Sequence, residues 1–201
     1  MLRIILASKS PRRKKLLTQL GFKFEVHPSD INEDISQAEP GKLVEQLALL
    51  KAGDVARHFP NSFIIGADTI VVHSGEILGK PKDETEAAEM LMRLSGSIHS
   101  VFTGVTLAKT DEKGFIDSKK TFYEQTNVQF STLTFREIQA YIKSGSPLDK
   151  AGAYGIQDDL GAVFVEKIVG DYYNVVGFPL NRFYRELKNF NPELANISFN
   201  A

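Results

Sequence analysis

Apolar and polar residues follow two alternating spacings along this chain, one typical of buried strands and one typical of helices. Short apolar runs rich in branched side chains, such as residues 2–7 and 63–72, indicate strands. Leucines at positions 16, 17 and 20, and again at 43, 47 and 50, recur at helical spacing. The pattern predicts strands over residues 2–7, 22–27, 63–72, 98–109, 121–130 and 162–168, and helices over residues 11–20, 42–59, 83–94, 134–143 and 179–190.

The order of these elements indicates the fold class. Strands and helices alternate, and two long strands in the middle of the chain are joined around the polar turn Asp111 to Gly114. This order predicts an α/β fold with a mixed central sheet covered by helices. No repeat, low-complexity stretch or flexible linker divides the sequence, so we expect one domain over residues 1–201.

Local signals mark three helix ends. Gly21 follows the first leucine-rich helix, and glycine readily takes the left-handed conformation that ends helices. Asp83 with Glu86, and Thr134 with Glu137, have the spacing of a capping box. We therefore expect helices to end at the first position and to begin at the other two.

The turn after the first strand has an unusual charge pattern. Pro11, which suits the first position of a helix, is followed directly by Arg12 and Arg13. The start of a helix already carries a positive field, so each cation there costs about 0.3–1 kcal/mol unless an anion offsets it. Free backbone N–H groups, the hydroxyls of Ser8 and Ser10 and two guanidinium groups therefore predict a phosphate-binding site.

Two ordinary explanations stay open for this segment. Basic residues in a first helical turn often form a solvated face, and Ser10 can act only as the N-cap that satisfies a free N–H group. The phosphate interpretation also requires that Arg13 and an interior acid from a distant stretch face one common hollow.

Asp68 interrupts an apolar strand. Burying a carboxylate costs free energy unless the group is paired, protonated or bound to a metal. Gly66 and Ala67 leave space beside it for a ligand or for a close backbone crossing. The alternatives are a structural ion pair with a buried lysine or arginine, or a position at a strand end that faces water.

Three other charged residues are candidates for a metal or phosphate site. Glu33 lies in an acidic loop, and together with Asp68 it could supply the one or two carboxylates that usually hold Mg²⁺ beside phosphate oxygens. Lys51, on a predicted helix, and Lys80, in a glycine–proline turn, could contact phosphate as point charges. Each also has an ordinary explanation, because acidic loops and lone helical lysines are usually solvated.

The segment from Asp149 to Gln157 consists of small residues with one aromatic residue, Tyr154. Its glycines permit unusual backbone angles or contact with a flat ligand. Gln157 could read a base edge because its amide both donates and accepts hydrogen bonds. The alternative is a plain strand connection held by Tyr154. Neither GxxxxGK[ST] nor GxGxxG occurs, so the P-loop and the dinucleotide fingerprint are excluded.

Composition limits the classes of function. The formal net charge is −1, so any basic site is local and nucleic acid is not an expected partner. The chain contains no cysteine, which excludes disulfides and thiolate metal sites and fits a reducing compartment. No apolar stretch approaches the roughly 18 residues of a membrane span, and the apolar start is too short for a signal peptide. We therefore expect a cytoplasmic protein without a membrane partner.

Five stretches, taken together, carry a family resemblance. They are Leu6 to Arg13, Ile65 to Thr69, Gly79 to Pro81, Leu94 to Gly96 and Asp149 to Gln157. In this order, and spanning nearly the whole chain, they resemble the Maf family of nucleotide pyrophosphatases. The resemblance implies an elongated, two-lobed Maf/ITPase-like α/β fold with a cleft. It also implies hydrolysis of a nucleoside triphosphate to the monophosphate and pyrophosphate, with Mg²⁺ or Mn²⁺ as cofactor.

The resemblance also implies residue roles. Asp68 occupies the position of the catalytic base, and Glu33 and Asp68 are the implied metal ligands. The positions implied to bind substrate are Ser8, Ser10, Arg12, Arg13, Lys51, Thr69, Lys80 and Gln157.

Three of these positions are associated with substrate preference. Arg12, Thr69 and Gln157 are the residues of the branch that resembles dTTP/UTP pyrophosphatases. Other pyrimidine or modified nucleotides are further expected substrates, with removal of non-standard nucleotides as an expected role. The branch that acts on 7-methyl-GTP tends to have tryptophan, glutamine and glutamate at these positions. One departure follows Gln157, where the family usually continues with a glycine and a short turn but this chain has Asp158 and Asp159.

Other functions stay open at the level of sequence. The same segments could bind a nucleotide or a nucleic-acid phosphate without hydrolysis, as a regulator of septum formation, a process to which members of this family have been linked. Such a binder would not need Glu33 and Asp68 as metal ligands, and its affinity would not require Mg²⁺. A phosphomonoesterase, which releases orthophosphate, is a third class. The family resemblance further implies a homodimer.

Overall fold

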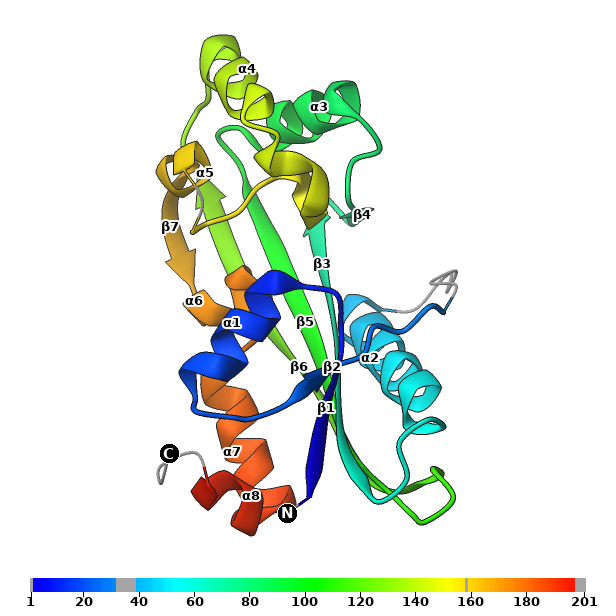
Figure 1. Cartoon of the computed structure of the whole chain (residues 1–201). Coiled ribbons are helices and arrows are strands. Elements are labelled where there is room, and N and C mark those ends of the chain that lie inside the picture. Colours follow the sequence, from blue (N-terminus) through cyan, green and yellow to red (C-terminus); the bar gives the residue numbers. More distant parts are fainter. Residues whose placement is uncertain (1, 32–38, 158, 198–201) are drawn as a thin grey trace. The chain divides into compact units, whose positions relative to one another are not determined.

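The computed structural model describes residues 2–31, 39–157 and 159–197 of the chain (Figure 1). Its elements, in chain order, are β1 (Arg3–Ala7), α1 (Pro11–Gln19), β2 (Glu25–Val26), α2 (Pro40–Ala56), β3 (Ser62–His73), β4 (Glu76–Leu78), α3 (Glu84–Leu94), β5 (Ile98–Thr110), β6 (Ile116–Phe130), α4 (Phe135–Lys143), the 3₁₀ helices η1 (Ser146–Asp149) and η2 (Ala151–Ala153), α5 (Asp159–Phe164), β7 (Val165–Val169), α6 (Tyr172–Val176), α7 (Leu180–Phe190) and α8 (Pro192–Ile197).

The strands form a mixed sheet. Within the described residues, seven strands are hydrogen-bonded in the order β2-β1-β3-β5-β6-β7, with β4 paired to β3. β1 runs parallel to β2 and to β3, whereas β4 is antiparallel to β3 and β7 is antiparallel to β6. The predicted α/β class with a mixed sheet is therefore confirmed.

Contacts within the chain divide it into two compact units. Unit 1 comprises Met1–Asp68, Thr103–Glu124 and Gly177–Ala201, and unit 2 comprises Thr69–Phe102 and Gln125–Val176. The strands β3, β5 and β6 contribute residues to both units. A single domain over residues 1–201 stays a prediction.

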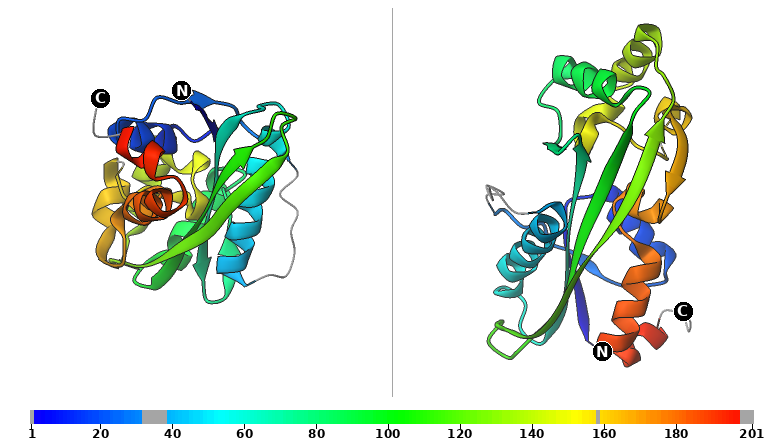
Figure 2. Two further views of the ribbon diagram at one scale, coloured as in Figure 1. Left: turned by 90° about the horizontal axis from the view of Figure 1, so that it is seen from below. Right: turned by 180° about the vertical axis from the view of Figure 1, so that it is seen from behind.

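In unit 1, β1 lies between β2 and β3, and a helix connects each successive pair of these strands. α1 connects β1 to β2, and α2 connects β2 to β3, which lies on the other side of β1. Because crossovers between parallel strands are right-handed, connections that run in opposite directions place their helices on opposite faces of the sheet. Figures 1 and 2 show α2 on one face and α1 with α7 on the other.

Two glycines let α2 approach the sheet closely. A Cβ on Gly66 of β3 would overlap the carbonyl oxygen of Ala48, and a Cβ on Gly104 of β5 would overlap that of Val44. Glycine is therefore required at both strand positions. The leucine spacing predicted that Leu50 shares one side of this helix with Leu43 and Leu47. This prediction is wrong for burial, because Leu50 is 46% exposed and the helix turns its smaller residues toward the strands. The buried residues of α2 are Gly41, Leu43, Val44, Leu47, Ala48, Ala52, Val55 and Ala56.

α1 ends as its sequence predicts. The amide of Gly21 donates to the carbonyl of Thr18 at 2.9 Å, and the amide of Phe22 donates to that of Leu17 at 3.4 Å. These two bonds form a Schellman motif, in which the residue after the cap is left-handed. Gly21 has a φ of 80°, so the predicted glycine stop is confirmed.

In unit 2, α3 packs against α4, η1 and η2. The capping box of α4 is confirmed, because Thr134 Oγ1 accepts from the Glu137 amide while the Glu137 carboxylate accepts from the Thr134 amide. At α3, Asp83 accepts from the Glu86 amide at 2.9 Å, but the Glu86 carboxylate accepts from the Lys82 amide. Half of the predicted box forms there.

The structure differs from the prediction mainly in short elements. The strand expected over residues 22–27 is reduced to β2, and residues 162–164, expected in a strand, belong to α5. β4, α6 and α8, which have three, five and six residues, had no predicted counterpart. Segments this short are stabilised by their neighbours, so their own sequences carry little periodic signal.

Replacing Gly66 by alanine should destabilise the protein. The new Cβ would lie 2.9 Å from the Cβ of Ala52 and would overlap the Ala48 carbonyl, so α2 or β3 must shift. We expect a loss of about 1–3 kcal/mol in the free energy of unfolding, typical of overpacking, measured by chemical denaturation.

Gly53→Ala is the matched control, because a Cβ on Gly53 of the same helix would meet no atom within 4 Å. Alanine is the better helix former, so this variant should gain up to about 1 kcal/mol. Parent-like stability of Gly66→Ala would contradict the close packing of α2.

Candidate functional site

The candidate site in unit 1 lies where β1 ends and β3 continues. β1 pairs with β3 up to Ala7, which lies opposite Gly66, and the chain then turns away into α1. β3 runs on through Ala67 and Asp68. The helices that flank these parallel strands lie on opposite faces, so this edge is a topological switch point. Open α/β sheets bind ligands at such points, outside the carboxyl ends of their strands.

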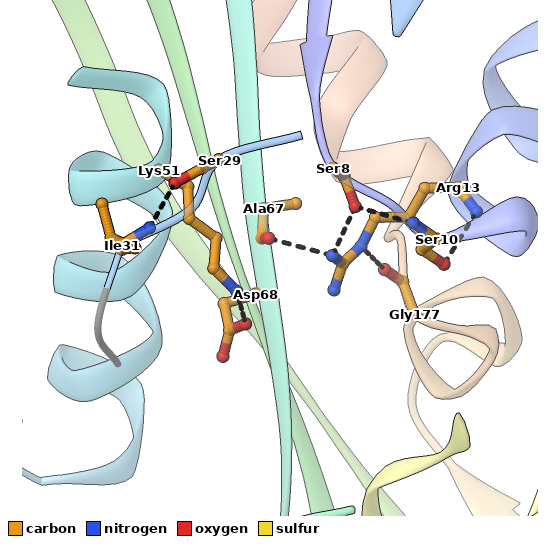
Figure 3. Close-up of polar contacts among 9 residues, drawn as sticks. All are labelled: Ser8, Ser10, Arg13, Ser29, Ile31, Lys51, Ala67, Asp68 and Gly177. Atoms are coloured by element: carbon orange, nitrogen blue, oxygen red, sulfur yellow. Dashed lines mark hydrogen bonds and ion pairs between the residues drawn. The ribbon is translucent and has the colours of Figure 1, made fainter. Parts of the chain in front are cut away.

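Two serine hydroxyls hold the turn between β1 and α1 (Figure 3). Ser8 Oγ accepts a hydrogen bond from the Ser10 amide at 3.2 Å, and Ser10 Oγ accepts one from the Arg13 amide at 3.4 Å. Ser10 is therefore the N-cap of α1, the ordinary role that the sequence left open. A hydroxyl can donate while it accepts, so this role still permits both O–H groups to bond to a phosphate oxygen.

Arg13 is buried and joins three segments of unit 1. Its Nε donates to the carbonyl of Gly177 at 3.0 Å, and its Nη1 donates to the carbonyl of Ala67 at 2.9 Å and to Ser8 Oγ at 3.0 Å. These three acceptors are uncharged, so they satisfy N–H donors without bringing a negative charge to the guanidinium. Arg13 thus fixes the turn after β1, the stretch of β3 next to Asp68, and the segment before α7.

Arg13 and Asp68 reach neighbouring residues of β3 from different sides. The guanidinium comes from α1 and bonds to the Ala67 carbonyl, whereas the Asp68 side chain points toward α2, and β3 passes between the two in Figure 3. The sequence predicted that Arg13 binds substrate. The structure gives it contacts within the protein, and its contact with a substrate stays a prediction. With β3 between Arg13 and Asp68, the common hollow that the phosphate interpretation requires gains no support from this pair.

Lys51 and Asp68 form an ion pair between α2 and β3. Asp68 lies two residues after Gly66, so both face α2, and Lys51 lies on the same side of α2 as Ala48 and Ala52. Lys51 Nζ lies 2.5 Å from Asp68 Oδ1, and the two side chains are only 12% and 10% exposed. Lys51 is therefore not a solvated surface lysine, and the second oxygen of Asp68 turns away from it in Figure 3.

Stabilisation of the fold does not by itself explain a buried ion pair at this place. Removing both charges from water costs desolvation energy that their attraction only partly repays, and apolar side chains of similar size would stabilise a fold at least as well. The pair sits at the edge of the sheet where ligands bind in this class of fold. Its position therefore favours a chemical role for Asp68.

The residues around Asp68 fit a metal that is shared with a substrate. A carboxylate oxygen is a hard ligand of the kind that Mg²⁺ prefers, and Mg²⁺ is usually held by one or two carboxylates together with phosphate oxygens. Within residues 2–31, 39–157 and 159–197, no three His, Cys, Asp or Glu side chains gather into a complete metal site. Glu33, the other predicted ligand, lies outside the described residues.

Three predicted site residues belong to unit 2. Thr69 directly follows Asp68 on β3 and is partly exposed, while Lys80 and Gln157 are exposed. A backbone bond from the Gly152 amide to the Gly79 carbonyl, 3.0 Å long, places the turn of Lys80 beside the segment that ends in Gln157. These two predicted binding residues are thus brought onto adjoining segments of one unit.

Arg12 lies in the first turn of α1 and is partly exposed. It follows the N-cap, where the first N–H groups of a helix have no partner within the helix and the helix dipole favours an anion. The ordinary N-cap and the phosphate site are therefore compatible at this helix end.

Sequence reasoning missed the main-chain partners of the site. The carbonyls of Ala67 and Gly177 hold Arg13, but nothing in a residue's identity indicates which carbonyl will accept a bond. Gly177 has a φ of 115°, a conformation that glycine adopts easily. The one sequence feature that marks this segment is the glycine itself, shortly before α7.

Curated relatives match nearly the full length of this chain. The chain is 51% identical over 191 residues to a dTTP/UTP pyrophosphatase of Bacillus pumilus (strain SAFR-032), covering 94% of this chain and 97% of the relative. It is 49% identical over 197 residues to a dTTP/UTP pyrophosphatase of Bacillus cereus (strain AH820), covering 98% and 100%. Among solved structures, a HAM1 protein from Coxiella burnetii aligns with a TM-score of 0.47 and 16% identity, over 65% of this chain and 73% of that one.

The family assignment follows from the sequence comparison. Residues 3–190 match the family described as Maf-like protein, which is most of the 201 residues. The two relatives are about half identical to this chain over nearly their full lengths. The resemblance seen in five separate stretches is thereby confirmed, and this chain belongs to the Maf family.

Proposed function

We propose that this protein is a nucleoside triphosphate pyrophosphatase that converts dTTP and UTP, or modified nucleotides of the same class, to the monophosphate and pyrophosphate. The observation that carries the proposal is the junction at β3. There the serine turn and the N-terminus of α1 lie on one side of Ala67, and the buried Lys51–Asp68 pair lies on the other. Relatives from Bacillus pumilus and Bacillus cereus that bear the name dTTP/UTP pyrophosphatase support the choice of substrate.

The start of α1 is proposed to bind the phosphates. The positive end of the α1 dipole, the hydroxyls of Ser8 and Ser10 and the guanidinium of Arg12 supply donors and positive charge for a polyanion. Arg13 holds this turn against β3 through Ser8 and Ala67, so the donors are already in place before substrate binds. Such preorganisation spares the reaction the cost of reorienting dipoles as charge develops on the phosphates.

Asp68 is proposed as the general base. An ionised carboxylate can take a proton from the water that attacks the phosphate. Lys51 holds one carboxylate oxygen at 2.5 Å, which fixes the orientation of the side chain and turns the other oxygen away. Lys51 is thus a positioning residue for Asp68, and its ammonium group also adds positive charge near the phosphates.

Asp68, with Glu33 and phosphate oxygens, is proposed to hold a divalent cation, Mg²⁺ or Mn²⁺. When bound, the cation supplies Lewis-acid stabilisation of negative charge on the phosphate oxygens. A carboxylate has about four lone-pair sites on its two oxygens, so Asp68 keeps acceptor sites for a cation and for a proton besides the one that Lys51 occupies.

Base recognition is proposed for Thr69 and Gln157, with Lys80 as a further phosphate contact. Both Thr69 and Gln157 carry groups that donate and accept hydrogen bonds, as a pyrimidine edge requires. Asp158 and Asp159 give the sequence after Gln157 an acidic character.

The cytoplasm is the proposed compartment, and a homodimer is the proposed assembly. A chain without cysteine fits a reducing environment. No helix among the described residues combines the length and the apolar character needed to cross a bilayer.

A panel of nucleoside triphosphates, assayed with and without Mg²⁺ or Mn²⁺, separates the candidate functions. We expect pyrophosphate from UTP and dTTP, and at least a hundredfold less when the metal is removed by a chelator, because metal charge stabilisation is worth several kcal/mol. Binding without turnover and without metal dependence would instead favour the regulator, and orthophosphate as the first product would favour a phosphomonoesterase.

Asp68→Asn should remove most of the activity. The amide keeps the size of the carboxylate but cannot accept the proton, so we expect pyrophosphate release to fall by about 10²–10⁴-fold. The circular dichroism spectrum should stay that of the parent. The melting temperature should fall, because Lys51 loses its charged partner.

Asp54→Asn is the matched control for that change. Asp54 lies on α2, and its carboxylate accepts a hydrogen bond from the Asp30 amide at 3.2 Å, which an asparagine oxygen can also accept. This variant should keep parent activity. Near-parent turnover by Asp68→Asn would remove Asp68 from the role of base.

Gln157→Glu should change substrate preference more than stability. Gln157 is exposed, so the new charge is solvated in the folded protein, but it removes an amide donor and repels base carbonyl oxygens. We expect kcat/KM for UTP relative to GTP to fall by about tenfold or more. Gln139→Glu, which adds the same charge on α4, should leave the ranking unchanged, and an unchanged ranking in Gln157→Glu would refute its role in reading the base.

A further inference from the structure

A buried hydrogen bond lies behind the segment that carries Gln157. The hydroxyl oxygen of Tyr154 lies 2.8 Å from His99 Nε2, and both side chains are buried. Their rings meet edge to face at 5.3 Å, and Phe130 packs edge-on against His99 at 5.0 Å and against Tyr154 at 4.7 Å. Water is thus excluded, and a hydrogen bond in such surroundings is strong and directional.

Neither partner of this bond is charged near neutral pH. Burial, assisted by the nearby His73, lowers the pKa of His99 to about 3. Burial likewise raises the pKa of the Tyr154 phenol above its ordinary value. A neutral imidazole and a neutral phenol that do not titrate near pH 7 are poor candidates for acid–base catalysis, so the pair has a different role.

Two more hydrogen bonds anchor the same segment. The Gly152 amide donates to the Gly79 carbonyl at 3.0 Å, and the Gly155 amide donates to the Tyr141 hydroxyl at 3.1 Å. Gly79 directly precedes Lys80. The anchors therefore connect the turn of Lys80 to the segment that ends in Gln157.

The backbone of this segment is strained. Gly152 and Ala153 have φ values of 68° and 60°, and the left-handed region is unfavourable for alanine. A Cβ on Gly152 would also lie only 3.0 Å from the side chain of Val71. Such a conformation persists only where the surroundings hold it in place. Tyr154 comes directly after Ala153, so its buried hydrogen bond is well placed to do so.

We propose that the Tyr154–His99 hydrogen bond positions the segment from Gly152 to Gln157, so that Gln157 and Lys80 meet the nucleotide in one fixed arrangement, and that it thereby contributes to base discrimination. This inference rests on the proposed function, because it assigns Gln157 to the base. Tyr154 and His99 act through other residues and are positioning residues. Gln157 is three positions after Tyr154, and Ile156, directly before Gln157, is buried.

Tyr154→Phe tests the proposal because it keeps the ring and removes the hydroxyl. We expect KM for UTP and dTTP to rise by roughly three- to tenfold, the equivalent of one net hydrogen bond, with kcat within about twofold of the parent. The preference for UTP over GTP should fall by a similar factor. Amide hydrogen exchange in residues 151–157 should become faster, whether or not substrate is present.

Three further variants separate positioning from general damage. Tyr172→Phe removes an exposed hydroxyl from α6 of the same unit and should change none of these quantities. His99→Leu should reproduce the effects of Tyr154→Phe. His99→Gln, whose side-chain amide can donate through its nitrogen or accept through its oxygen at the place of Nε2, should restore KM and exchange toward the parent values. The Tyr154→Phe, His99→Leu double variant should be no worse than either single variant.

The outcomes are distinguishable. Parent KM, parent nucleotide ranking and parent exchange in Tyr154→Phe would overturn the proposal, as would an equal loss in His99→Leu and His99→Gln. If the parent protein releases no pyrophosphate from any triphosphate, the proposed function fails and the role in base discrimination fails with it. The exchange measurement then decides separately whether the hydrogen bond holds the segment.

Discussion

The close packing of α2 on β3 is the constraint on which the candidate site depends. Glycine at position 66 lets the helix backbone lie directly over the strand, and no larger residue fits there. The strand period of two then turns Asp68 toward the helix, while the helical period turns Lys51 toward the strand. The ion pair at 2.5 Å follows from these two periodicities and this one small residue.

The connectivity of the parallel strands adds a second constraint. The connection from β1 to β2 and the connection from β2 back to β3 run in opposite directions along the sheet. Their helices, α1 and α2, therefore lie on opposite faces. β1 ends at Ala7, opposite Gly66, so the edge of β3 at Ala67 and Asp68 is no longer paired with β1. Arg13 reaches that edge from α1 and bonds to the Ala67 carbonyl, one residue from the acid. The first turn of α1 and the buried acid are therefore tied to neighbouring residues of one strand, from its two sides.

Much of this arrangement could be predicted from residue patterns. The apolar runs located most strands, leucine spacing located the long helices, and Gly21 and the Thr134–Glu137 box located helix ends. The pairing of Asp68 with a buried lysine was one of the alternatives that the sequence left open.

What could not be predicted depends on tertiary contacts. Leu50 has the helical spacing of a core residue but is exposed, because α2 is rotated by its contact with Gly66 and Gly104. The buried position of Lys51 follows from the same rotation. The capture of Arg13 by two backbone carbonyls involves groups that every residue carries, so no side-chain pattern could indicate it. The Tyr154–His99 bond joins residues 55 positions apart, which local reasoning cannot relate.

The most direct test of the account is an experimental structure of the protein with Mg²⁺ and a UTP analogue whose α–β bridging oxygen is replaced by a methylene group. The account predicts that the phosphates contact the hydroxyls of Ser8 and Ser10 and the first turn of α1, with a carboxylate oxygen of Asp68 next to the metal. Phosphates bound away from α1, with Asp68 still enclosed by Lys51 and distant from the nucleotide, would contradict it.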